Sequence, residues 1–185
     1  MAICRAFRVA AVALAIAATG CGGSSSSGFG WLHPGPAPNG WRMVALRTGG
    51  AALPVPPGWR SIRGDAGTAS AAVYDAHRTI VGYLNATPRQ QGESLAGWRA
   101  FRPRHNAQEG NTDVRTLASA TGLRFRTGTG SCVQDSYRTS ITSYREIACI
   151  VRGRRGTTVI VAAATPSRWP RLAATLEQAV SSFTT

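Results

Sequence analysis

Residues 157–164 read Thr-Thr-Val-Ile-Val-Ala-Ala-Ala, and residues 167–183 follow as Ser-Arg-Trp-Pro-Arg-Leu-Ala-Ala-Thr-Leu-Glu-Gln-Ala-Val-Ser-Ser-Phe. The first run is β-branched and alanine-rich without a charge, which predicts a strand in the middle of a sheet. In the second run Ser167 is the expected N-cap and Pro170 falls in the first turn. One helix face collects the apolar side chains, namely Trp169, Leu172, Leu176, Val180 and Phe183. The pair predicts an amphipathic closing helix that packs on a sheet.

Upstream, residues 131–139 and 143–152 have the pattern of two strands joined by a short turn. A two-residue loop at Ser140-Ile141 would place Cys132 opposite Cys149. A cross-strand disulfide is expected there, and closing a loop of this length contributes on the order of 3 kcal/mol.

The same register has an unfavourable consequence. It places Asp135 opposite Glu146, and like charges directly opposite each other destabilise a sheet. Either a neighbouring arginine, Arg145 or Arg138, screens this pair, or a longer turn with a bulge changes the register. The sequence leaves both alternatives open.

The remaining elements complete the fold class. Further strands are expected at 43–46, 51–55, 69–74, 79–84, 114–117 and 123–126. A middle helix is expected from Glu93 into the low hundreds, with Gly92 or Ser94 as its cap and Pro103 ending or kinking it. Strands dominate, so the prediction is an α+β domain with a mainly antiparallel sheet, packed by a middle helix and a C-terminal helix.

The N-terminus indicates where the protein works. Arg5 and Arg8 precede an apolar run from Val9 to Ala18, too short to span a bilayer, and Cys21 follows. This layout resembles a bacterial lipoprotein signal, in which residues 1–20 are removed and Cys21 carries the lipid. The alternative is an ordinary secretory signal cut after residues 15–17.

The number of cysteines favours lipidation of Cys21. Cys4 is removed with the signal. If Cys21 is lipidated, Cys132 and Cys149 remain as a single pair that can form a disulfide. The Gly/Ser/Pro-rich residues 21–42 are predicted to be a flexible tether, and 43–185 a single domain. Phe29, Trp31 and Trp41 could rest on the membrane or dock on the domain. The expected location is the extracytoplasmic side of the cell membrane.

The charge is strongly positive. The chain has 21 basic residues, all arginine, against 8 acids. Such a charge favours anionic lipid or cell-wall polymers as partners, and an exported protein is not expected to bind nucleic acid. Codon bias and a solvated surface would explain the same composition.

Motifs for catalysis are scarce. His33, His77 and His105 lack metal-ligand spacing, and the glycine-rich residues 128–132 do not match the nucleophile elbow G-x-S-x-G. We therefore expect no enzyme, no metal and no cofactor. A polar cluster near the middle helix is the candidate binding site, formed by Asn85, Thr87, Arg89, His105 and Asn106.

The element order carries one further indication. A strand pair leads into Pro56-Pro57-Gly58-Trp59, and the closing helix ends at Ser182-Phe183. Over about residues 43–183 this resembles the PsbP-like α/β/α fold of photosystem accessory proteins and LpqN-type bacterial lipoproteins. The resemblance implies a non-catalytic accessory module that binds an envelope protein. Binding of anionic lipid or cell-wall glycan is the alternative, and a hydrolase comes last.

Overall fold

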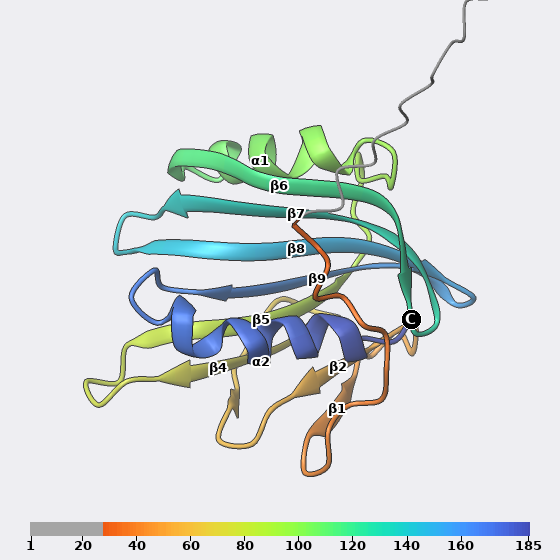
Figure 1. Cartoon of the computed structure of the whole chain (residues 1–185), viewed down its shortest axis with the longest axis horizontal. Helices are drawn as coiled ribbons and strands as arrows, with labels where there is room; N and C mark the ends of the chain where they lie inside the picture. Colours follow the sequence, from red (N-terminus) through yellow and green to blue (C-terminus); the bar gives the residue numbers. More distant parts are fainter. Residues whose placement is uncertain (1–27) are drawn as a thin grey trace, which may run out of the picture.

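The structure is a computed structural model, and it describes residues 28–185. Seven strands form one sheet in which every neighbouring pair is antiparallel (Figure 1). Their order across the sheet is β3 (Arg60–Ser61), β4 (Ala69–Tyr74), β5 (Ile80–Pro88), β9 (Gly156–Ala164), β8 (Ser143–Gly153), β7 (Gly128–Arg138) and β6 (Thr112–Phe125). The uncharged strand β9 is central, as its composition predicts.

The two faces of the sheet are covered by different elements. Helix α2 (Trp169–Ser182) and the two-stranded ribbon of β1 (Arg42–Ala45) and β2 (Ala52–Val55) pack on one face. Helix α1 (Trp98–Gln108) covers β6 and β7 on the other face, over a smaller apolar cluster around Trp98. This confirms the predicted α+β class.

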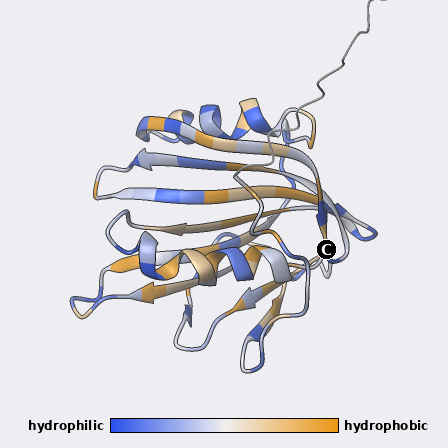
Figure 2. Ribbon diagram, in the orientation of Figure 1, coloured by the Kyte–Doolittle hydropathy of each residue, from blue (hydrophilic) through white to orange (hydrophobic). Residues whose placement is uncertain are grey.

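On the face of the sheet that α1 covers, the two halves of β8 differ in hydropathy. In Figure 2 this strand passes from a hydrophilic first half to a hydrophobic second half. The second half contributes Ala148 and Ile150 to the apolar cluster under Trp98. The first half contributes Glu146, which is completely buried. A charged group therefore lies inside the interface between α1 and the sheet.

The β7–β8 hairpin has the predicted register. The N–H of Thr139 donates to the carbonyl of Thr142 across 2.8 Å, which leaves two residues in the loop. Cys132 lies opposite Cys149, and the two form a disulfide in the buried core. Asp135 also lies opposite Glu146, so the register was not changed by a longer turn.

The predicted start of the middle helix is wrong. Helix α1 begins at Trp98 because residues 90–97 are folded into turns. The Glu93 carboxylate accepts the N–H of Gln90 at 2.6 Å, and Ser94 Oγ accepts the N–H of Gly97 at 3.1 Å. These side chains cap turns and not the helix.

The expectation that Pro103 ends or kinks the helix is also corrected in part. Helix α1 continues through Pro103 to Gln108. The proline removes one intrahelical donor, but buried Trp98 and Asn106 on either side of it hold the helix to the sheet. Tertiary packing outweighs the local preference here.

Two further boundaries differ from expectation. The strands predicted at 114–117 and 123–126 are one strand, β6, which bends at three irregularities of register. Gly122, with φ of +68°, lies at the last of them. In α2, Ser167 is not the N-cap: the carbonyl of Thr165 accepts the N–H of Trp169 at 2.9 Å, and Arg168 precedes the first helical residue.

The N-terminal part of the described chain packs on the domain. Phe29 is only 4% exposed and belongs to the main core, and Trp31, Leu32 and Trp41 pack against it. The carbonyl of Ser181 accepts the N–H of Gly35. Residues 28–42 of the predicted tether are thus part of the folded unit, because their aromatic side chains bury apolar area there.

The predicted signal (1–20), the lipidated Cys21 and the start of the tether (21–27) lie outside the described residues. Across 28–185, none of the helices is both long and apolar enough to cross a membrane.

Candidate functional site

The predicted polar cluster is only partly assembled. Asn85 and Thr87 lie on the α1 side of β5, because they alternate with Leu84 and Ala86 of the α2-side core. Ser70 Oγ donates to Asn85 Oδ1 at 2.9 Å. Both residues are half-buried.

The other three members lie apart from them. Arg89 Nη1 donates to the carbonyl of Glu93 at 2.9 Å. His105 stacks on Phe101 and its Nε2 lies 3.1 Å from Glu109 Oε1. Asn106 is buried, and of the five it is the one that contacts a concentration of charged groups.

That concentration lies between α1 and the β7–β8 hairpin, and its centre is Glu146. Arg102 of α1 approaches the carboxylate with two donors: Nε to Oε1 at 2.7 Å and Nη2 to Oε2 at 2.8 Å. This is the bidentate geometry in which guanidinium and carboxylate bind most strongly. Burial disfavours the charge on Arg102, but Glu146 more than offsets it, and the pKa of the guanidinium is raised.

Asp135 is the second carboxylate of the site, opposite Glu146 in the hairpin. Asn106 Nδ2 donates to its Oδ2 at 3.1 Å, while Oδ1 is buried without a hydrogen-bond partner. Burial, followed by the charge of Glu146, raises the pKa of Asp135 to about 8. Since Arg102 engages both oxygens of Glu146, the proton resides on Asp135 at neutral pH.

The hydroxyls of two tyrosines reach the same carboxylate, and a third tyrosine packs against their rings. The hydroxyls of Tyr83 and Tyr137 share a hydrogen bond of 2.7 Å, and Tyr137 Oη donates to Glu146 Oε2 at 3.1 Å. Tyr144 packs edge-on against Tyr83 with ring centroids 5.4 Å apart. Burial, and then the charge of Glu146, raises the pKa of both Tyr83 and Tyr137. Both hydroxyls are therefore neutral donors.

The prediction that Arg145 or Arg138 screens the two opposed carboxylates is wrong. Arg145 points to the opposite face of the sheet from Glu146, as adjacent strand residues do, and stacks over the Trp169 ring at 4.6 Å. Arg138 forms an exposed ion pair of 3.5 Å with Asp113. The residue that neutralises the site, Arg102, was missed. The sequence feature that could have predicted such a residue is the pair of opposed carboxylates, because a buried like-charge pair requires a cation from another element.

The buried site is suited to a structural role more than to catalysis. Glu146 is fully buried, and its carboxylate oxygens are engaged by Arg102 and Tyr137. Among residues 28–185, no three His, Cys, Asp or Glu side chains gather to hold a metal ion. The arrangement fixes α1 to the hairpin, since breaking it would leave an uncompensated charge in the interior.

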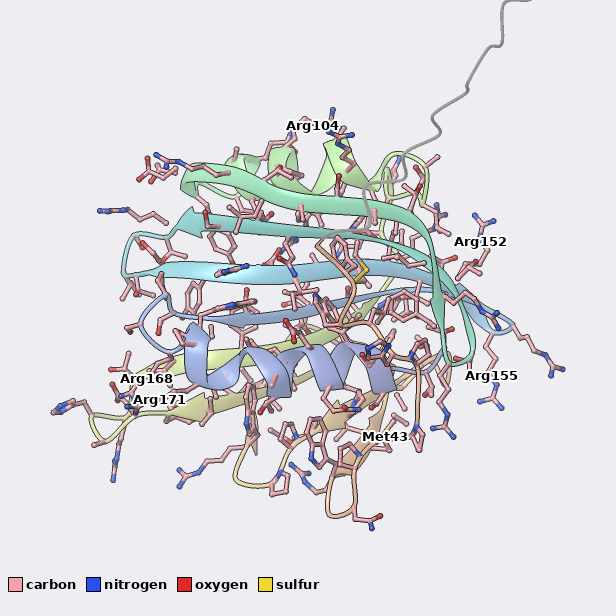
Figure 3. The ribbon with its side chains drawn as sticks, viewed as in Figure 1. Met43, Arg104, Arg152, Arg155, Arg168 and Arg171 are labelled. Carbon is pink, nitrogen blue, oxygen red and sulfur yellow. A yellow bond between two sulfur atoms is a disulfide. The ribbon has the colours of Figure 1, made fainter. Side chains whose placement is uncertain are left out.

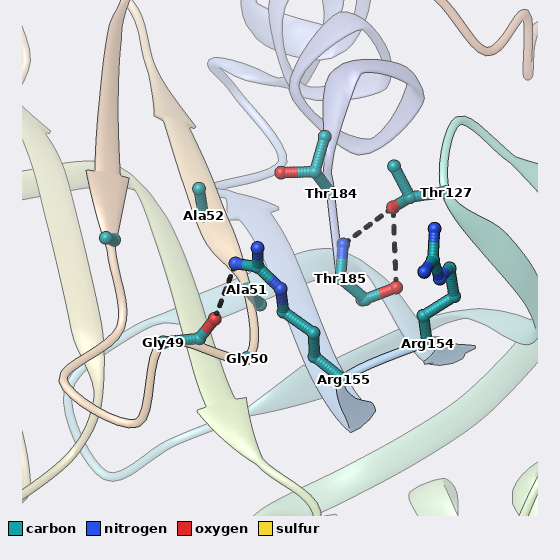
Figure 4. Close-up of a pocket in the computed structure, with 10 residues that line it drawn as sticks. Gly49, Gly50, Ala51, Ala52, Thr127, Arg154, Arg155, Thr184 and Thr185 are labelled. Carbon is teal, nitrogen blue, oxygen red and sulfur yellow. Dashed lines mark hydrogen bonds between the residues drawn. The ribbon is translucent and has the colours of Figure 1, made fainter.

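A different, solvent-accessible site lies where the β8–β9 turn meets the end of the chain (Figure 4). It is a cavity of about 670 Å³ between the β1–β2 turn, Thr127 and the two arginines Arg154 and Arg155. Arg155 Nη1 donates to the carbonyl of Gly49 at 3.3 Å, and Thr127 Oγ1 accepts the N–H of Thr185 at 2.8 Å. Its donors suit an anionic group.

The architecture of the described residues matches a known one. The solution structure of cyanobacterial PsbP (CyanoP) from Synechocystis sp. PCC 6803 superposes with a TM-score of 0.54, covering 78% of this chain and 92% of that one. The fold is PsbP-like. At 11% identity the likeness concerns the PsbP-like fold alone.

LpqN of Mycobacterium tuberculosis, involved in cell envelope biogenesis, is also similar, at 15% identity and a TM-score of 0.45, covering 78% of this chain and 91% of LpqN. No family model and no curated protein matches the sequence.

Proposed function

We propose that this chain is an exported, lipid-anchored protein of the bacterial cell envelope whose domain is a non-catalytic binding or accessory module. The observation that carries the proposal is the buried disulfide between Cys132 and Cys149. Disulfides persist in oxidising compartments outside the cytoplasm. The pairing leaves Cys21 as the remaining cysteine of the sequence after the predicted signal, which supports its modification.

The burial of the ionisable groups supports binding over catalysis. Glu146 and Asp135, the two carboxylates that face each other in the hairpin, are fully buried beneath α1, where no substrate reaches them. His33, His77 and His105 are on separate segments of the chain. A protein partner from the envelope is the proposed ligand, and the half-buried Asn85 and Thr87 remain candidate contact residues.

Lipidation is tested by the mass of the mature N-terminus in a bacterial host, with and without globomycin. We expect a lipid-modified N-terminus at Cys21, accumulation of the unprocessed precursor with globomycin, and release of a Cys21→Ser variant from the membrane. An unmodified N-terminus generated by cleavage after Ala17 would contradict the anchor.

The binding role is tested by cross-linking and capture of the membrane-anchored protein, with an Asn85→Ala/Thr87→Ala variant compared in parallel. A partner enriched over an unrelated lipoprotein, and weakened by the substitutions, is the expected result. Capture of the same proteins by both lipoproteins would count against a specific partner. Failure to capture any protein partner, combined with binding to anionic lipid or wall glycan, would favour the alternative function.

A further inference from the structure

Six exposed arginines gather at one end of the sheet. The β6–β7 turn, the β8–β9 turn and the β1–β2 turn meet there, because Gly128 pairs with Gly153 and Arg155 binds the carbonyl of Gly49. The arginines on these turns or in the strand ends beside them, here called the basic end, are Arg47, Arg124, Arg126, Arg152, Arg154 and Arg155. Figure 3 shows Arg152 and Arg155 projecting from this end into solvent, away from Arg168 and Arg171.

The basic end is poor in acidic groups. Its three turns contain no Asp or Glu, and among the described residues none of the six arginines forms an ion pair. Asp65, in the neighbouring loop between β3 and β4, is exposed, and the exposed Arg63 lies two residues before it. At the opposite end of the sheet, arginines are interspersed with Asp75 and Asp113. The two ends therefore differ in electrostatic potential although both carry arginine.

We propose that the basic end docks on the anionic phospholipid headgroups of the membrane that holds the protein. The inference rests on the proposed lipid anchor, which confines the domain to that surface. Each basic residue near an anionic bilayer contributes on the order of 1 kcal/mol, and guanidinium groups bind phosphate in bidentate fashion. Six such groups at one end of the sheet, on or beside three neighbouring turns, match a surface of phosphates better than a single ligand.

The length of the connecting chain allows this orientation. Gln134 Nε2 donates to the carbonyl of Gly28, so the described chain begins beside the middle of β7. From Gln134 to Gly128 the strand covers about 20 Å. Seven peptide units from Cys21 to Gly28 span at most about 24 Å. The anchor thus reaches a membrane that touches the basic end. It would also reach the other end, so charge, and not length, selects between them.

The test uses the chain from residue 21 onward with Cys21→Ser, so that its outcome does not depend on lipidation. Its partition is measured on vesicles of phosphatidylcholine and on vesicles that also contain phosphatidylglycerol. We expect binding to the anionic vesicles, loss of binding at high salt, and no binding to phosphatidylcholine. Absence of binding to the anionic vesicles, or binding indifferent to salt, would overturn the proposal while leaving the lipid anchor intact.

A matched pair of variants separates location from net charge. Arg126→Gln/Arg152→Gln/Arg154→Gln removes three charges from the basic end, and these side chains have no hydrogen-bond partner among the described residues. The expected loss is about a hundredfold in partition coefficient. The control Arg99→Gln/Arg104→Gln/Arg171→Gln removes three exposed charges elsewhere and should lower binding at most about threefold. Equal losses in the two variants would overturn the assignment to this surface.

Orientation gives a second readout that does not require a loss of binding. A fluorophore on Thr48→Cys, at the basic end, is compared with one on Ile141→Cys, in the β7–β8 turn at the opposite end, where Ile141 is 89% exposed. A headgroup-linked quencher should quench the label at position 48 more than the label at 141. Equal quenching, or the reverse order, would contradict docking through the basic end.

Discussion

Arg102 on α1 and Glu146 on β8, 44 residues apart, form a bidentate ion pair with distances of 2.7 and 2.8 Å, beneath a helix that no sequence pattern places there. The pair neutralises one member of the opposed carboxylates that the hairpin register creates. The other, Asp135, is neutralised by a proton. Together they explain how a sheet with two facing acids accommodates them in its interior.

Removing the cation should be strongly destabilising. In Arg102→Met the apolar stem is retained, but Glu146 is left as a buried charge with only tyrosine donors, so we expect a loss of about 3–5 kcal/mol in the free energy of unfolding. Urea denaturation measures this. The double variant Arg102→Met/Glu146→Leu should recover most of the loss. A single variant within about 1 kcal/mol of the wild type would show that the pair is not needed to hold α1.

The raised pKa of Asp135 predicts a pH dependence of stability. The folded state holds a proton up to about pH 8, whereas the unfolded state releases it near the ordinary value of 3.8. Between these values the folded state binds more protons, so stability is highest at the acidic end of this window and falls as pH rises, by up to about 1.4 kcal/mol per pH unit. The variant Asp135→Asn keeps an acceptor for Asn106 and should lose this slope.

The measurement is urea denaturation of both proteins at about pH 5 and about pH 8. The stability of Asp135→Asn relative to wild type should increase towards pH 8. Asp75→Asn is the control: hydrogen bonding from the Thr79 N–H lowers the pKa of Asp75, and its contribution is lost only in stronger acid. Parallel pH profiles for wild type and Asp135→Asn would refute the proton assignment.

The disulfide should be a large contributor to stability. It closes a loop with a sequence separation of 17, for which the loss of unfolded-state entropy contributes about 3 kcal/mol. Cys132→Ala/Cys149→Ala should lower the free energy of unfolding by at least this amount, because the side chains are also buried in the core. Unfolding of the oxidised wild type, reduced wild type and double variant checks this. Equal stability of the oxidised and reduced wild type would contradict it.

The segment before β1 should behave as part of the domain. Phe29→Ala removes a buried ring and should cost about 3–5 kcal/mol. His33→Ala, at an exposed position of the same segment, should change stability by less than about 0.5 kcal/mol. Similar, small effects of the two substitutions would restore the view of residues 28–42 as a tether.

Local and neighbouring elements of this protein follow from the sequence. The uncharged run of β9 dictates a central strand, the apolar spacing of α2 dictates a helix on the sheet, and a two-residue loop fixes which residues of β7 and β8 face each other. These features depend on periodicity and on short-range geometry. The disulfide and the opposed acids, Asp135 and Glu146, follow from that register alone.

Features that join distant segments required the tertiary structure. The start of α1, its passage through Pro103 and the docking of Phe29 depend on area buried against strands far along the chain. Arg102 neutralises Glu146, and Arg145 does not, because α1 covers the face of the sheet on which Glu146 lies. The basic end likewise exists because antiparallel pairing brings three separate turns to one edge. A sequence shows which groups need partners, and only the packed fold decides which partners come within reach, because non-local contacts form between elements whose order along the chain does not fix their spacing.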